Sequence, residues 1–102
     1  DAYLHQHLLP ERSLLQVYPN PFALRTTLRF TLPKAEPRYA VRFSLLDGRG
    51  RRVQTLRAAH YPPGFHQQDW QVPELLPGLY VVEMQVTTPR GVQTYFQKVV
   101  SQ

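Results

Sequence analysis

The sequence contains no cysteine. This absence excludes disulfide bonds, thiol catalysis and cysteine-ligated metal sites. Long apolar runs are also missing, because no uninterrupted stretch approaches the roughly 20 residues that a membrane-spanning helix needs. The chain has 102 residues, of which 42% are hydrophobic. That length and composition predict one globular domain with a core of its own.

Acidic side chains are scarce: seven Asp and Glu face twelve Lys and Arg, so the formal net charge is +5. This excess suggests an anionic partner. We expect no nucleic acid, because no motif supplies the exposed aromatics that such binding uses. Arg49, Arg51 and Arg52 form a candidate anionic-surface patch around the "DGRGRR" turn. Arginines 25, 29 and 42 lie on outward strand positions and would make an arginine-lined sheet face if their strands were neighbours.

Apolar and polar residues alternate with a period of two through most of the chain, which is typical of strands with one buried face. Glycine and proline turn signals, "DGRG", "YPPG", "LLPG" and "TPRG", separate these segments. About seven short strands are predicted, at residues 14–18, 24–32, 41–47, 51–56, 64–72, 79–86 and 92–100. The pattern is that of an all-β, immunoglobulin-like antiparallel β-sandwich.

Two aromatic residues have predicted structural roles. Trp70 is expected to fill the core, as a lone tryptophan on a sandwich strand usually does. Tyr80 follows "PG" at the start of a strand, where a tyrosine hydroxyl can tie back to a neighbouring loop. Residues 1–13 have no clean period and are interpreted as a linker from an upstream domain, with the sandwich spanning residues 14–102.

Groups for catalysis or metal binding are few. No serine lies on a glycine-flanked elbow, and His60, His66 and Asp69 are interpreted as polar residues of a strand and its turn. The pair His5 and His7 supplies too few ligands for a structural zinc site. We therefore expect no enzyme, no metal and no cofactor.

Several motifs together resemble a known family. "YPNPF" opens the domain and "LRFTL" follows; "VRFSLLDGRGRRVQTL", "GFHQQDW" and "LLPGLYVVEM" come next, and "QKVV" lies near the end. Their order and spacing are similar to those of the type A C-terminal sorting domain of the type IX secretion system. The same outline is similar to the immunoglobulin-like domain of the flagellar hook-capping protein. The resemblance covers residues 14–102.

The resemblance implies a non-catalytic sorting signal at the end of a secreted protein of a Gram-negative bacterium. The attached N-terminal cargo would cross the periplasm, be recognised by the outer-membrane translocon with its shuttle or sortase components, and reach the cell surface or the medium. A sortase-like peptidase would cut at the linker, and the cargo would be joined to anionic lipopolysaccharide or released.

By the same resemblance, motif positions of the family fall on specific residues of this chain. The domain entry and turn positions are Pro19, Asn20, Pro21, Gly48 and Arg49. The sorting and recognition positions are Gly78, Tyr80, Tyr95, Phe96, Lys98, Val99 and Val100. We interpret Tyr95–Val100 as a recognition element, because a terminal edge strand suits strand addition to a partner.

Simpler explanations exist for the same residues: turn geometry for Gly48 and Gly78, packing for Tyr80, the core for Val100 and edge protection for Lys98.

Two other functions remain open at this stage. An accessory module that binds polysaccharide for an attached hydrolase would present aromatics in a row, and Tyr61, Phe65 and Trp70 are the nearest set. A passive spacer of fibronectin type III kind is the other alternative.

Overall fold

The computed structural model describes residues 13–18, 25–55, 58–72 and 75–101. Within them the chain forms eight strands. The strands are β1 (Leu14–Tyr18), β2 (Arg25–Leu32), β3 (Tyr39–Leu46), β4 (Arg52–Thr55), β5 (Ala59–Tyr61), β6 (Gly64–Gln71), β7 (Gly78–Thr88) and β8 (Gly91–Ser101). No helix in this part of the chain is long and apolar enough to cross a membrane.

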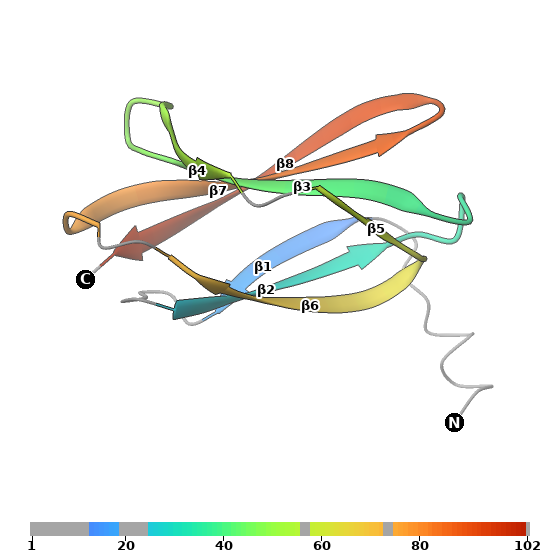
Figure 1. Ribbon diagram of the computed structural model, residues 1–102, viewed down its shortest axis with the longest axis horizontal. Helices are drawn as coiled ribbons and strands as arrows, with labels where there is room; N and C mark the ends of the chain where they lie inside the picture. Colours follow the sequence, from blue (N-terminus) through green and yellow to red (C-terminus); the bar gives the residue numbers. More distant parts are fainter. Residues whose placement is uncertain (1–12, 19–24, 56–57, 73–74, 102) are drawn as a thin grey trace.

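The strands form two antiparallel sheets that stack face to face (Figure 1). The small sheet has the order β1-β2-β6, and the large sheet has the order β4-β3-β7-β8, with β5 also paired to β3. The predicted all-β, antiparallel sandwich is confirmed. The eighth strand, β5, was not predicted, because its three residues are too few to show alternation.

The core lies between the sheets and is built by the predicted alternation. The inward residues of β2, β3 and β7 are at most 9% exposed. They are Leu28, Phe30, Leu32, Tyr39, Val41, Phe43, Leu45, Tyr80, Val82, Met84 and Val86. Trp70 is 2% exposed, so its predicted place in the core is confirmed.

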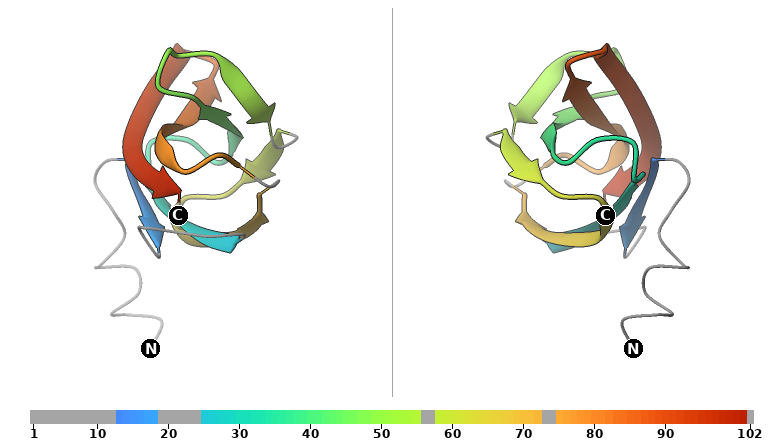
Figure 2. Two further views of the ribbon diagram at one scale, coloured as in Figure 1. Left: turned by 90° about the vertical axis from the view of Figure 1, so that its left-hand side faces the viewer. Right: turned by 90° about the vertical axis from the view of Figure 1, so that its right-hand side faces the viewer.

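Strand direction brings three distant segments to one end of the large sheet. β3 and β8 both run antiparallel to β7, so their ends lie beside its beginning. Leu46 pairs with Val81, and Val100 pairs with Leu79. The β3–β4 turn, the start of β7 and the end of β8 therefore meet at the end that faces the viewer in the left panel of Figure 2. The predicted recognition positions at the start of β7 and the end of β8 therefore lie at this end of the sheet.

Candidate recognition surface

The carboxylate of Asp47 organises the turn between β3 and β4. Its Oδ1 accepts hydrogen bonds from the backbone N–H groups of Arg49 and Arg51, each at 2.9 Å. Its Oδ2 accepts one from Nε of Arg51 at 3.1 Å. The hydrogen bond from the backbone of Arg51 is the main cause that holds the pKa of Asp47 below its ordinary value of 3.8. The turn is thus stabilised by an ionised carboxylate at its centre.

The two glycines of this turn have different roles. Gly50 has a φ of 82°, a left-handed conformation that side chains disfavour, whereas Gly48 has no positive φ. A Cβ at Gly48 would lie 3.7 Å from the backbone oxygen of Leu79, an ordinary contact. Turn geometry therefore explains Gly50, and the prediction that it explains Gly48 was wrong. Gly48 instead lies against the start of β7.

Apolar side chains cover the outer face of the large sheet beside this turn. Phe96 is 61% exposed, Leu79 51% and Val100 41%. Lys98 lies between Phe96 and Val100 on the same face of β8 and pairs with Val81 of β7. The simpler explanation of Val100 as a core residue was wrong; its neighbour Val99 is the one that is fully buried.

A groove of about 520 Å³ joins this face to the turn. Its walls come from the end of β3, the turn, β7 and β8. They are Leu46, Asp47, Gly48, Gly50, Leu79, Val81, Phe96 and Lys98. We call these residues, together with Arg49 and Val100, the C-terminal corner. Pairing and burial thus bring Gly48, predicted as a turn position, together with Phe96, Lys98 and Val100 of the predicted recognition element in one accessible surface.

The remaining predicted recognition residues have structural places. The hydroxyl of Tyr80 donates a hydrogen bond to the carbonyl of Leu76 at 2.7 Å, which confirms the predicted tie to the neighbouring loop. Gly78 has a φ of 154° and pairs with Ser101 at the start of β7. Tyr95 points inward, packs against the core and donates its hydroxyl proton to Gln93 at 2.7 Å. Pro19, Asn20 and Pro21 lie outside the described residues.

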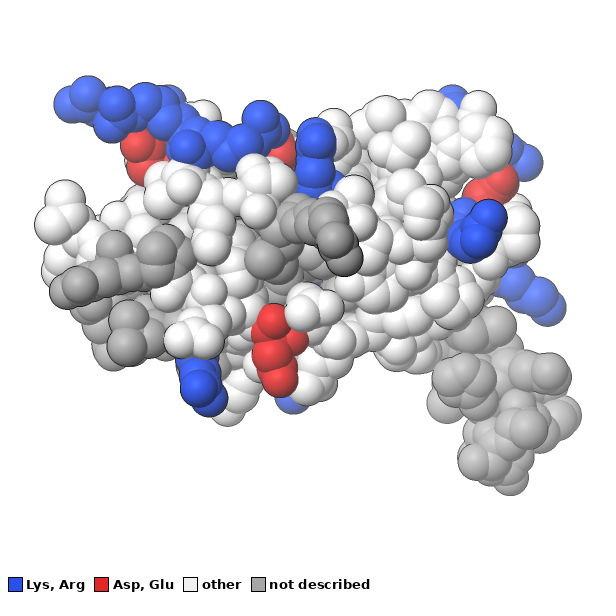
Figure 3. Space-filling model, viewed as in Figure 1, with Lys and Arg blue, Asp and Glu red and all other residues white. Residues whose placement is uncertain are grey.

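The basic patch is partly neutralised. Lys and Arg side chains gather over β4 and the turn before it (Figure 3), but two carboxylates lie among them. Arg51 forms an ion pair with Asp47 at 3.1 Å, and Arg52 forms one with Glu83 at 3.3 Å. Arg49 has no carboxylate of a described residue within ion-pair distance.

The wider arginine-lined face does not form. Arg25 and Arg29 lie on β2 of the small sheet, whereas Arg42 lies on β3 of the large sheet and donates a hydrogen bond to Gln85. Since these strands belong to different sheets, their outward faces point in opposite directions.

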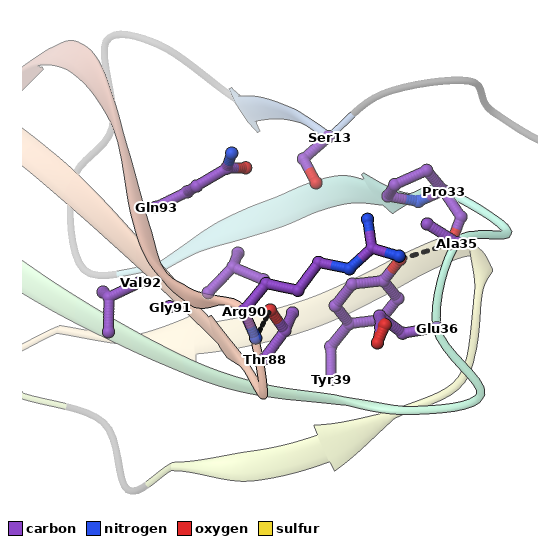
Figure 4. A pocket seen from close by; sticks show the side chains of 11 residues that line it. Ser13, Pro33, Ala35, Glu36, Tyr39, Thr88, Arg90, Gly91, Val92 and Gln93 are labelled. Atoms are coloured by element: carbon purple, nitrogen blue, oxygen red, sulfur yellow. Dashed lines mark hydrogen bonds between the residues drawn. The ribbon is translucent and has the colours of Figure 1, made fainter.

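A second cavity, of about 410 Å³, lies at the other end of the sandwich (Figure 4). Arg90 from the β7–β8 hairpin and Tyr39 from β3 both face it, and Glu36 lies at its side. The Tyr39 hydroxyl donates a hydrogen bond to the Pro33 carbonyl at 2.6 Å. Burial raises the pKa of Tyr39, so its hydroxyl stays protonated and serves as a structural tie.

The other polar candidates serve in structural contacts. A ring nitrogen of His66 lies 2.6 Å from the Pro62 carbonyl, and Asp69 accepts a hydrogen bond from Thr27 at 3.0 Å. Among the described residues no group of three His, Cys, Asp or Glu could hold a metal ion. His5 and His7 lie outside the described residues.

The aromatic residues that would support the polysaccharide-binding alternative do not form a row on one exposed face. Trp70 is buried and Phe65 is 58% exposed on the opposite face of β6. The Trp70 indole donates its hydrogen bond to Gln54 at 3.1 Å, so this ring cannot serve as a stacking platform.

Leu46, Leu79 and Val81 were not predicted as members of the surface. For Leu79 and Val81 a signal was available, because they share the phase of their strand with Glu83 and Gln85 and are thus apolar side chains in the polar phase of an alternating pattern.

The two stacked antiparallel sheets define an all-β sandwich domain of the predicted class. The sequence matches the family "Secretion system C-terminal sorting domain" over residues 16–102. The chain therefore belongs to this family, the C-terminal sorting domains of the type IX secretion system, and its role is that of a secretion signal. Membership implies interaction with the secretion machinery and secretion across the outer membrane of Gram-negative bacteria. No curated protein matches the sequence significantly.

Two solved structures share the fold. One is dimeric latent PorU from Porphyromonas gingivalis, with a TM-score of 0.73 and 19% identity over 92% of this chain. The chain spans only 10% of that protein. The other is CopC from Methylosinus trichosporium OB3b, with a TM-score of 0.52 and 20% identity over 89% of this chain and 94% of that one. At these identities the likeness concerns the sandwich alone.

Proposed function

We propose that the secretion machinery recognises this domain at the C-terminal corner. The observation that carries the proposal is a convergence. Gly48 comes from a motif about fifty residues before that of Phe96 and Lys98, and the three residues line one exposed groove, with Val100 beside it on the same face. Exposed Phe96 and Val100 supply apolar contact area, and Lys98 between them supplies a charge that gives the contact specificity. Family membership accounts for the sorting role, and the corner is our assignment of its site.

The outer face of β8 suits the same role. Among the described strands β8 pairs with β7 and also contacts β1 of the small sheet. A partner segment that lies along the outer face would meet the side chains of Phe96, Lys98 and Val100. The eleven residues of β8 offer ample length for such a contact.

The rest of the proposed function is supported by membership of the family. The domain is non-catalytic, and residues 1–13 connect residues 14–102 to an N-terminal cargo. The cargo passes through the periplasm and reaches the cell surface or medium through the outer-membrane type IX translocon. Shuttle or sortase components act on it there, with cleavage in the linker.

Anionic lipopolysaccharide is a further proposed partner, at Arg49, Arg51 and Arg52. The ion pairs of Arg51 and Arg52 reduce the charge available, so Arg49 is expected to contribute most. Binding of purified anionic lipopolysaccharide should weaken on charge reversal of all three arginines. Unchanged binding would remove this partner from the proposal.

An export assay tests the corner. A periplasm-targeted fluorescent protein is joined to the full 102-residue chain in a bacterium that has this secretion system. Lys98→Ala and Phe96→Ala are expected to leave the reporter in the periplasm. The matched controls are Lys34→Ala and Phe65→Ala, two exposed residues outside the corner, and these should be exported normally.

The outcomes separate role from site. If the parent chain is exported and all four variants are exported equally well, the domain is a signal but the corner does not carry it. If the folded parent fusion itself stays in the periplasm, this chain does not act as a sorting signal in that host. Protease resistance of each fusion checks that the sandwich is folded.

A further inference from the structure

The outer face of the small sheet carries an exposed groove of its own, on the opposite side of the molecule from the C-terminal corner. It has a volume of about 560 Å³ and lies over β2, between β1 and β6. Leu14 and Phe65 are 51% and 58% exposed and stand on its two sides. Both pair with Thr31, so the three residues form one row across the sheet.

The next row across the same face is entirely polar. Gln16 pairs with Arg29, and Arg29 pairs with Gln67, so the guanidinium group lies between two amides. All three residues are exposed, and neither amide forms a hydrogen bond with another described residue. With strands about 4.8 Å apart, this row spans roughly 10 Å.

Arg29 is held on this face by an aromatic ring. Its guanidinium carbon lies 5.5 Å from the centre of the Tyr18 ring, a cation–π distance. No carboxylate of a described residue lies within ion-pair distance of it. The nearest acidic residue by register, Asp69, is one row away and accepts a hydrogen bond from Thr27. Within the part of the chain that the structure describes, the groove therefore presents an ordered cation without a bound counter-charge.

We propose that this groove binds an acidic saccharide. The Phe65 ring offers an apolar surface for the C–H face of a sugar ring, as aromatic platforms do. Gln16 and Gln67 both donate and accept hydrogen bonds, which matches sugar hydroxyl groups. Arg29 can hold the carboxylate of a uronic acid through two parallel N–H bonds. An apolar wall with a few convergent polar groups, at this volume, is the usual form of a small-ligand site.

The arrangement favours a sugar over a peptide. The floor of the groove is β2, which pairs with β1 on one side and with β6 on the other. Its backbone groups are therefore already used, and a peptide strand could not be added there. Binding would depend on side chains alone, and those present are two amides, a guanidinium and an aromatic ring. The groove is on a different sheet from the C-terminal corner, so saccharide binding can be tested independently of the proposed sorting surface.

Titration of the isotopically labelled 102-residue chain with oligogalacturonate, followed by NMR, tests the proposal. Amide shifts should change at Gln16, Arg29, Phe65 and Gln67. Phe65→Ala and Arg29→Gln should each weaken binding about tenfold, the loss expected for one aromatic contact or one charge-assisted contact. Phe96→Ala, which removes an equally exposed ring from the other sheet, should leave affinity unchanged. Methyl-esterified oligogalacturonate, which lacks the carboxylates, should also bind about tenfold more weakly.

Three results would overturn the proposal. One is the absence of any shift change on the small sheet. Another is binding that survives Phe65→Ala but disappears with modest salt, which indicates non-specific attraction to arginines. The last is a random-sequence acidic peptide that shifts the same amides with equal affinity. Well-dispersed spectra of each variant show that a loss of binding is not a loss of folding.

Discussion

The indole nitrogen of Trp70 on β6 donates a hydrogen bond to Oε1 of Gln54 on β4, at 3.1 Å. This bond joins the small sheet to the large sheet on the side of the sandwich opposite β8. Because Trp70 is only 2% exposed, water cannot readily replace Gln54 as the acceptor. A side chain on a short, largely exposed strand thus satisfies the polar atom of the largest aromatic group in the core.

Replacement of Gln54 by leucine should therefore destabilise the domain. The change leaves the Trp70 N–H buried without an acceptor, which costs about 1–3 kcal/mol of unfolding free energy. Urea denaturation followed by tryptophan fluorescence measures the loss. Gln67→Leu, at an exposed amide without a described partner, is the control and should have little effect. Equal stability of the two variants would mean that the Trp70 hydrogen bond contributes nothing.

Tyr80→Phe isolates the hydroxyl that ties β7 to the preceding loop. Loss of the 2.7 Å hydrogen bond to Leu76 should lower the unfolding free energy by about 0.5–1.5 kcal/mol, while the ring keeps its place in the core. We expect export of a fused reporter to persist, since the hydroxyl is not part of the C-terminal corner. Loss of export at full stability would show instead that the secretion machinery contacts Tyr80.

The two glycines of the β3–β4 turn should respond differently to alanine. Gly50→Ala forces a side chain into a φ of 82° and should cost about 1–2 kcal/mol. Gly48→Ala meets only an ordinary contact and should change stability by less than about 0.5 kcal/mol. Thermal and urea unfolding of both variants measure these effects.

Export of the same pair then separates structure from recognition. Gly48→Ala places a methyl group at the wall of the C-terminal corner, so we expect slower export at unchanged stability. If Gly48→Ala exports like the parent chain, the close approach of the turn to β7 has no part in recognition.

Acid should weaken the β3–β4 turn through Asp47. Its folded pKa lies below 3.8, so the ionised form is favoured by folding. Its contribution is fully present above the unfolded pKa and is lost as the pH falls through the folded pKa. The stability difference between the parent chain and Asp47→Asn should therefore be constant near neutral pH and shrink below about pH 4. A difference that stays constant into strong acid would contradict this linkage.

Much of the fold could be predicted from alternation alone. The inward phases of β2, β3 and β7 and the burial of Trp70 follow from local patterns, because one face of each strand must meet the other sheet. The pairing of strands is not local, so the sequence could not show that Arg25 and Arg42 lie on opposite sheets. Likewise, β8 is apolar on both faces near its end, and its period alone did not show that Val99, rather than Val100, is the core residue.

The C-terminal corner was predictable in part. The motif resemblance marked Gly48 as a turn position and Lys98 and Val100 as recognition positions, on two separate segments. The sequence did not show that antiparallel pairing places distant segments side by side, with Leu79 opposite Val100 and Val81 opposite Lys98. Contact between residues some fifty positions apart depends on topology, which local propensity does not encode.

The place of β8 in the core has a consequence for synthesis and transport. A polypeptide is synthesised from its N-terminal side, so β8 is made after the seven other strands that the structure describes. Until then the core lacks Val99, which is fully buried, and all eleven residues of β7 lack their pairing partners in β8. A polypeptide interrupted before β8 can therefore neither close its sandwich nor display the C-terminal corner. Export through this domain would thus be restricted to cargo whose translation has run past the last strand.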